Sequence, residues 1–78
     1  MMKERVQTIL YVANQLKRTG KTSASTGEQI AAAFVLNRQR YLPKAYDDMV
    51  EAWDRLETPW QHAVRIIKRD YMHLNNGR

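Results

Sequence analysis

The sequence predicts an all-α fold: a compact single domain of about four short helices that spans residues 1–78. Apolar residues recur with the 3.6-residue period of an α-helix along most of the chain. Glycine, proline and capping residues separate these periodic segments. No two strand-like runs are present that could pair into a sheet. A chain of 78 residues has room for one small hydrophobic core.

The first helix is expected to extend to about Arg18, because its apolar residues fall on one face of a helical wheel. Gly20 stands where a helix C-cap is expected, since glycine adopts the left-handed backbone conformation of that position without strain. The predicted inward face carries Met2, Val6, Ile9, Leu10, Val12, Ala13 and Leu16.

A second helix should begin near Thr26, where two capping boxes are equally compatible with the sequence. One pairs Ser25 with Glu28, and the other pairs Thr26 with Gln29. Residues 30–36 are apolar around the whole helical wheel, so neighbours must enclose this helix on most sides. Three consecutive alanines favour a helix over a buried strand. This segment is therefore the predicted centre of the domain.

The third helix is predicted over Lys44 to Glu57, with Pro43 as its first-turn proline. This stretch contains five acidic and only two basic residues, and the rest of the chain is strongly basic. The acids are expected on a solvated face and the apolar residues on the other. The predicted apolar face carries Tyr46, Met49, Val50, Trp53 and Leu56.

The fourth helix is predicted to start at Thr58, with Pro59 at its first position and Gln61 completing a capping box. Trp53 and Trp60 are both expected to be largely buried, linking the third and fourth helices. The predicted inward residues of the fourth helix are Trp60, Ala63, Val64, Ile67, Tyr71 and Leu74.

The composition argues against an enzyme. The chain contains no cysteine, which excludes disulfides, thiol chemistry and cysteine-based zinc sites. His62 and His73 lie about 16 Å apart along one helix and cannot share a metal ion. The Gly20-Lys21 pair lacks the glycine of a phosphate-binding loop five positions earlier, where Gln15 stands. We therefore expect no catalytic residue, no metal and no cofactor.

The N-terminal segment indicates neither secretion nor a membrane. Residues 1–17 are amphipathic and interrupted by charged and polar side chains, unlike a signal peptide or a membrane span. Together with the absence of cysteine, this predicts a cytoplasmic protein that does not bind a membrane.

We therefore predict a small non-enzymatic interaction or accessory protein that acts through surface contacts. Tyr11 on the first helix, with Ile66 and Met72 on the fourth, are the candidate interface residues. The all-round apolar second helix suggests that a second copy covers part of it. The expected partner is therefore a homodimer mate or another protein.

The alternative prediction is a nucleic-acid-binding module, because the chain carries a net charge of +5. Arg65, Lys68 and Arg69 form a basic row on the fourth helix, which is how a helix presents cations to successive phosphates. Arg38 and Arg40 are the candidate residues of the connection between the second and third helices. The other cations near helix ends are Lys17, Arg18, Lys21 and Lys44.

Overall fold

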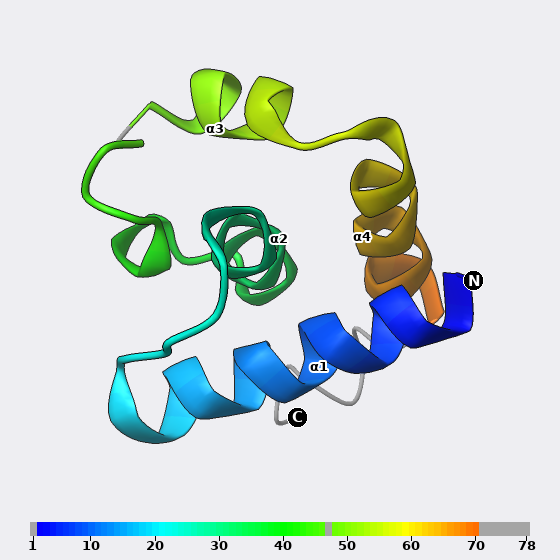
Figure 1. Ribbon diagram of the computed structural model, residues 1–78, viewed down its shortest axis with the longest axis horizontal. Coiled ribbons are helices and arrows are strands. Elements are labelled where there is room, and N and C mark those ends of the chain that lie inside the picture. The colour runs from blue at the N-terminus through cyan, green and yellow to red at the C-terminus, as the bar shows by residue number, and fades with distance from the viewer. Residues whose placement is uncertain (1, 47, 71–78) are drawn as a thin grey trace.

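The computed structural model describes residues 2–46 and 48–70, and this part of the chain contains helices and no strand. The predicted all-α fold is confirmed. No helix within these two ranges is both long and apolar enough to cross a membrane. The helices are α1 (Met2–Thr19), α2 (Thr26–Leu36), the 3-10 turn η1 (Gln39–Tyr41), α3 (Met49–Arg55) and α4 (Thr58–Asp70) (Figure 1).

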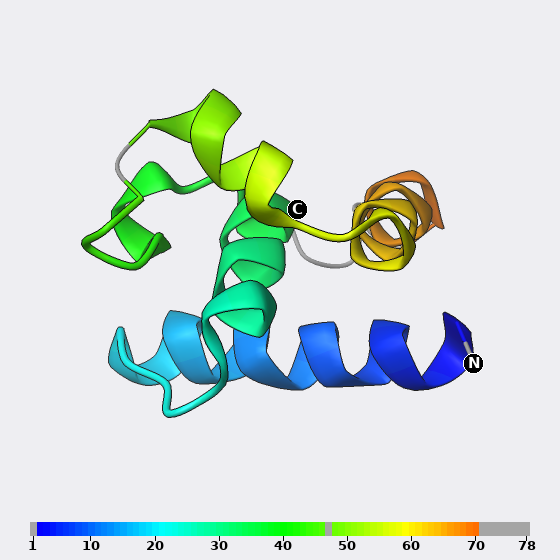
Figure 2. The same cartoon turned by 45° about the horizontal axis from the view of Figure 1, so that its top comes forward.

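Helix α2 is the centre of the molecule, as its apolar sequence predicts. In both views α1 and α3 lie on opposite sides of α2, and α4 lies beside it on a third side (Figures 1 and 2). Ile30, Val35 and the three alanines between them are each at most 1% exposed. The small alanine side chains allow neighbouring helices to approach the α2 backbone closely. The chain therefore covers most of α2 by itself, with Phe34 and Leu36 left half-buried.

Helices α1 and α4 supply most of the remaining core, and their predicted periodicity is confirmed. Their buried residues are Val6, Ile9, Val12, Ala13, Leu16, Ala63, Val64 and Ile67. The predicted inward residues Tyr71 and Leu74 lie outside the described residues.

The capping residues in the sequence predicted correctly where α1 ends and where α2 begins. Gly20 has a φ of 78°, and its N–H donates to the Leu16 carbonyl over 2.8 Å, which closes α1 in a left-handed C-cap. At the start of α2, the Glu28 N–H donates to Ser25 Oγ over 3.2 Å, and the Ser25 N–H donates to Glu28 Oε1 over 3.1 Å. The structure thus selects the Ser25 capping box from the two that the sequence allows.

The predicted third helix was too long at its N-terminal end. The Asp48 carboxylate accepts the N–H groups of Val50 and Glu51, which makes Asp48 the N-cap of α3. Pro43 is not a first-turn proline, because its carbonyl accepts the Tyr46 N–H in a separate turn before the helix.

The predicted apolar face of the third helix was also partly wrong. Val50 is 70% exposed, whereas Ala52 is fully buried. The inward stripe consists of Met49, Ala52, Trp53 and Leu56, spaced at i, i+3, i+4 and i+7. Val50 lies outside this stripe and faces solvent.

The fourth helix begins where the sequence predicts but is not closed by the predicted capping box. The Gln61 N–H donates to the Glu57 carbonyl over 3.1 Å, so Glu57 occupies the position before the first turn. The Gln61 side-chain amide instead donates to the Trp53 carbonyl over 2.9 Å. This hydrogen bond ties the end of α3 to the start of α4.

The two tryptophans are half-buried, so the expectation that both are largely buried was wrong. The Trp53 ring packs edge-on against Phe34 of α2, with centroids 5.0 Å apart. The Trp60 ring lies 5.7 Å from the Arg5 guanidinium carbon on α1. The rings therefore contact two different helices, and an arginine covers part of each, since Arg65 lies over Trp53.

Enclosure of α2 predicts opposite outcomes for the same substitution at two positions. Val35→Ala removes two buried methyl groups and should lower the free energy of unfolding by about 2 kcal/mol. Val50→Ala changes an exposed helical residue and should alter it by less than about 0.5 kcal/mol, toward higher stability, because alanine has the higher helix propensity. Urea denaturation followed by circular dichroism measures both. Equal losses in the two variants would contradict the assignment of α2 as the centre.

Candidate nucleic-acid interface

Lys68, the middle residue of the predicted basic row on α4, has a structural role. Its ammonium group donates to the Phe34 carbonyl over 3.1 Å and to the Asn37 side-chain oxygen. Asn37 ends α2 with a φ of 57°, a left-handed conformation that asparagine tolerates. A cation at this point satisfies a terminal carbonyl and complements the negative end of the helix dipole. Lys68 thus fastens α4 to the C-terminus of α2.

The other two residues of the basic row are exposed but have neighbours of their own. The Arg65 guanidinium lies 5.4 Å from the centre of the Trp53 ring, a cation–π contact between α4 and α3. Arg69 forms an ion pair with Asp70 over 3.0 Å. This hydrogen-bonded pair lowers the pKa of the Asp70 carboxyl and raises the pKa of Arg69. The α4 row therefore does not present three unengaged cations to a ligand.

A different group of cations lies at the opposite side of the molecule. We call it the basic end. Its members come from the C-terminal end of α1 and from η1 with its flanking residues, which lie on the left in Figures 1 and 2. Arg38 directly follows Asn37, which Lys68 of α4 contacts, and the other members lie across α2 from α4. All are exposed, and within residues 2–46 and 48–70 none is paired with a carboxylate. The basic end consists of Lys17, Arg18, Lys21, Arg38, Arg40 and Lys44.

Residues 17–44, which contain the basic end, account for the whole net charge of the protein. Residues 17–44 contain six basic residues and a single acid, Glu28. In the rest of the sequence, seven basic residues are matched by seven acids. The positive field of the molecule is therefore strongest at the end of α1 and around η1.

Two contacts hold η1 against the rest of the fold. The Gln29 side-chain amide donates to the Tyr41 carbonyl over 2.9 Å, which attaches η1 to α2. Leu42, directly after η1, is buried in the core. Arg40 lies 5.1 Å from the Tyr41 ring centre and donates to its hydroxyl over 3.3 Å. These contacts fix η1 to the fold, and η1 in turn holds Arg40 beside the end of α1.

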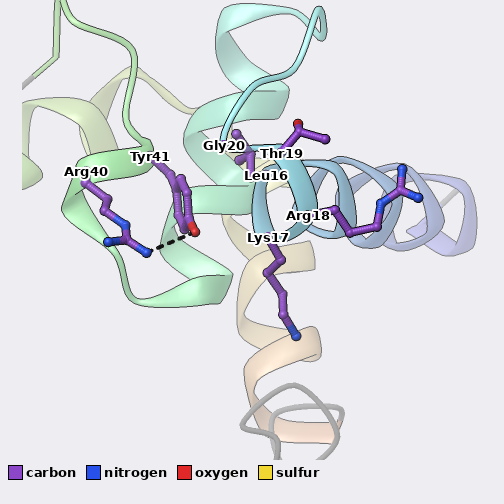
Figure 3. Close-up of a pocket in the computed structure, with 7 residues that line it drawn as sticks. All are labelled: Leu16, Lys17, Arg18, Thr19, Gly20, Arg40 and Tyr41. Carbon is purple, nitrogen blue, oxygen red and sulfur yellow. Dashed lines mark hydrogen bonds between the residues drawn. The ribbon is translucent and has the colours of Figure 1, made fainter.

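A shallow hollow of about 370 Å³ separates η1 from the end of α1 (Figure 3). None of the described residues that line it is acidic. The three cations around it point in different directions: Arg40 lies on the η1 side, Lys17 projects away from the helix, and Arg18 extends back along α1 (Figure 3). The lining residues are Leu16, Lys17, Arg18, Thr19, Gly20, Arg40 and Tyr41.

Of the four remaining predicted site residues, two are exposed, one is half-buried and one lies outside the described residues. Arg38 is exposed and directly precedes η1. Tyr11 is 66% exposed on α1, as expected for a contact residue. Ile66 is half-buried and packs against the core, so it is only a partial surface residue. Met72 lies outside the described residues. The signal that sequence reasoning missed was the single acid in residues 17–44.

Within the described part of the chain, no group of three histidine, cysteine or acidic side chains is close enough to hold a metal ion. His62 is exposed, and His73 lies outside the described residues. Comparisons of the chain with protein-family models, with curated proteins and with solved structures found no match. Geometry and charge are therefore the observations from which a function can be inferred.

The role of Lys68 predicts that it matters more for stability than the neighbouring Arg69. Lys68→Met keeps most of the aliphatic chain but removes the donor to Phe34 and Asn37, and should lower the free energy of unfolding by about 1 kcal/mol. Arg69→Met removes a fully exposed cation and should leave stability unchanged within the error of urea denaturation. An equal effect of both substitutions would argue against the proposed tie between α4 and α2.

Burial of Lys68 also predicts a pH dependence with a defined sign. Partial burial lowers the pKa of Lys68 below its ordinary value of 10.5. As pH rises toward that value, the folded protein releases this proton before the unfolded chain does, so this group makes stability rise with pH. Unfolding measured from neutral pH toward pH 10.5 should show wild type gaining stability relative to Lys68→Met. A constant difference between the two proteins would contradict the shift.

Proposed function

We propose that this protein is a small non-enzymatic binding protein that acts through its surface, and that its ligand is nucleic acid held by phosphate contacts at the basic end. The observation that carries the proposal is the set of six exposed cations, without a carboxylate partner in the described chain, around the end of α1 and η1. Lysine and arginine side chains that neutralise successive phosphates supply most of the sequence-independent affinity for nucleic acid.

The directions of the cations favour a polyanion over a single small anion. Lys17, Arg18 and Arg40 spread around the hollow rather than converge on one point (Figure 3). A single phosphate ion would be held by donors that point at it together. Charges that spread over a surface are suited to a chain of phosphates that passes across it.

The acidic residues support the same location. Described acids of the stretch before and within α3 lie on the far side of α2 from α1, away from the cations at the end of that helix, although Asp48 follows Lys44 of the basic end by only four positions (Figure 2). A negatively charged ligand would be repelled there and attracted to the basic end. The uneven distribution of charge therefore favours the basic end over α3 as the place where an anionic ligand binds.

Self-association, the other functional prediction, has weaker support. A second copy is not needed to cover most of α2, since five of its apolar residues are already buried within one chain and Phe34 and Leu36 are half-buried. Among the described residues, the large apolar side chains that are exposed are Tyr11 and Val50. They lie on α1 and α3, at opposite sides of α2, and form no continuous patch (Figure 1). A solution mass of two chains by light scattering, independent of salt and oligonucleotide, would favour the homodimer.

The proposal predicts which pair of cations matters for binding. Lys17→Gln with Arg40→Gln should weaken binding to a fluorescent mixed-sequence oligonucleotide about tenfold or more at low salt. The slope of log affinity against log salt should become shallower by about 1.5, because two phosphate contacts are lost. Fluorescence anisotropy across a salt series measures both quantities.

The matched control is Arg65→Gln with Arg69→Gln, which removes the same two positive charges from α4. Its affinity and salt slope should stay close to those of wild type. If the α4 variant loses binding and the basic-end variant does not, the interface lies on α4. If wild type shows no salt-dependent binding, the nucleic-acid proposal is wrong.

A further inference from the structure

Tyr11 lies beside the basic end and shares a surface hollow with one of its cations. A second shallow hollow, of about 260 Å³, is lined by Tyr11, Asn14, Gln15 and Arg18 on the exposed flank of α1. Arg18 also lines the hollow at η1, so one side chain borders both. The two hollows are therefore neighbours along α1, with Arg18 bordering both.

The Tyr11 ring is available to a ligand. It is 66% exposed, on a helix whose opposite face is buried. Arg18 is seven positions later, about 10 Å along the helix axis, and extends back along α1 toward the preceding turns (Figure 3). None of the described residues that line the Tyr11 hollow is acidic. A phosphate chain held at Arg18 would thus bring its neighbouring bases to an open aromatic ring.

An exposed aromatic ring beside a row of cations distinguishes between forms of nucleic acid. Surfaces that bind single strands combine a basic track for the backbone with aromatic rings on which bases stack. In a duplex the faces of the bases are covered by neighbouring base pairs, and the phosphates alone are accessible to such a surface. In a contact made only of phosphates, the Tyr11 hydroxyl could donate a hydrogen bond, but the ring would have no base to stack on.

We propose that the protein binds single-stranded nucleic acid, with the backbone along Arg40, Lys17 and Arg18 and a base stacked on Tyr11. This inference rests on the function proposed above and adds the form of the ligand. Asn14, which is exposed in the same hollow, offers an amide that can hydrogen-bond to the edge of the stacked base.

The test uses the full chain and three fluorescent ligands of equal phosphate number: a mixed-sequence single strand, a duplex, and a single strand of abasic sites. Wild type should bind the mixed-sequence strand more tightly than the other two at the same salt. Tyr11→Ala should weaken binding to that strand about tenfold, the usual effect of losing one stacked base, and leave the abasic strand unchanged. Tyr11→Phe keeps the ring and should bind within about twofold of wild type.

Each result separates the two proposals. If wild type binds all three ligands equally and Tyr11→Ala binds as wild type does, stacking is wrong and phosphate binding stands. An equal loss of affinity for all three ligands in Tyr11→Ala also overturns stacking. If wild type binds none of the three in a salt-dependent manner, both proposals fail. Equal salt-dependent binding to vesicles of anionic lipid and to the abasic strand, without preference for bases, would overturn the single-strand inference.

Discussion

The enclosure of the apolar core of α2 is the constraint on which the rest of the structure depends. A helix that is apolar all round is stable in water only when other parts of the chain cover it. Its run of alanines from Ala31 to Ala33 lets α1 and α4 pack against its backbone, while α3 and η1 close the remaining sides. Among the described residues of this 78-residue domain, this one helix supplies five of the sixteen buried hydrophobic side chains. The position of every other element follows from its contact with α2.

That arrangement separates the cations of the protein into two groups with different tasks. On α4, Lys68 satisfies the end of α2, and Arg65 covers the Trp53 ring. The contacts of these two residues add stability that the apolar packing of a small core does not supply. At the basic end, the cations are exposed around a hollow that no described acid lines, and Arg40 also contacts an aromatic ring, that of Tyr41. Equal formal charge in the sequence therefore has unequal electrostatic effect on the surface.

Helical periodicity was sufficient to predict α1, α2 and the described part of α4, because these helices bury one face or all faces in a single core. It failed for α3, where the side chain of Asp48 starts the helix later than the apolar pattern indicates. The candidate site was predicted less well, since the partner of Lys68 is 34 positions away in the sequence. Such pairings depend on tertiary position. The local excess of charge around Arg40 was countable from the sequence alone.

The contact between Lys68 and Asn37 connects two parts of the molecule that otherwise lie on opposite sides of α2. Asn37 ends α2, and η1 begins two residues later. The hydrogen bond from Lys68 therefore fixes the chain directly before η1. Arg40 therefore takes its position partly from a helix that does not line its hollow. Loosening the C-terminal turns of α4 would shift the support of Arg40 relative to the end of α1. The geometry of the exposed basic surface is thus sensitive, at a distance, to how firmly the last described helix is docked.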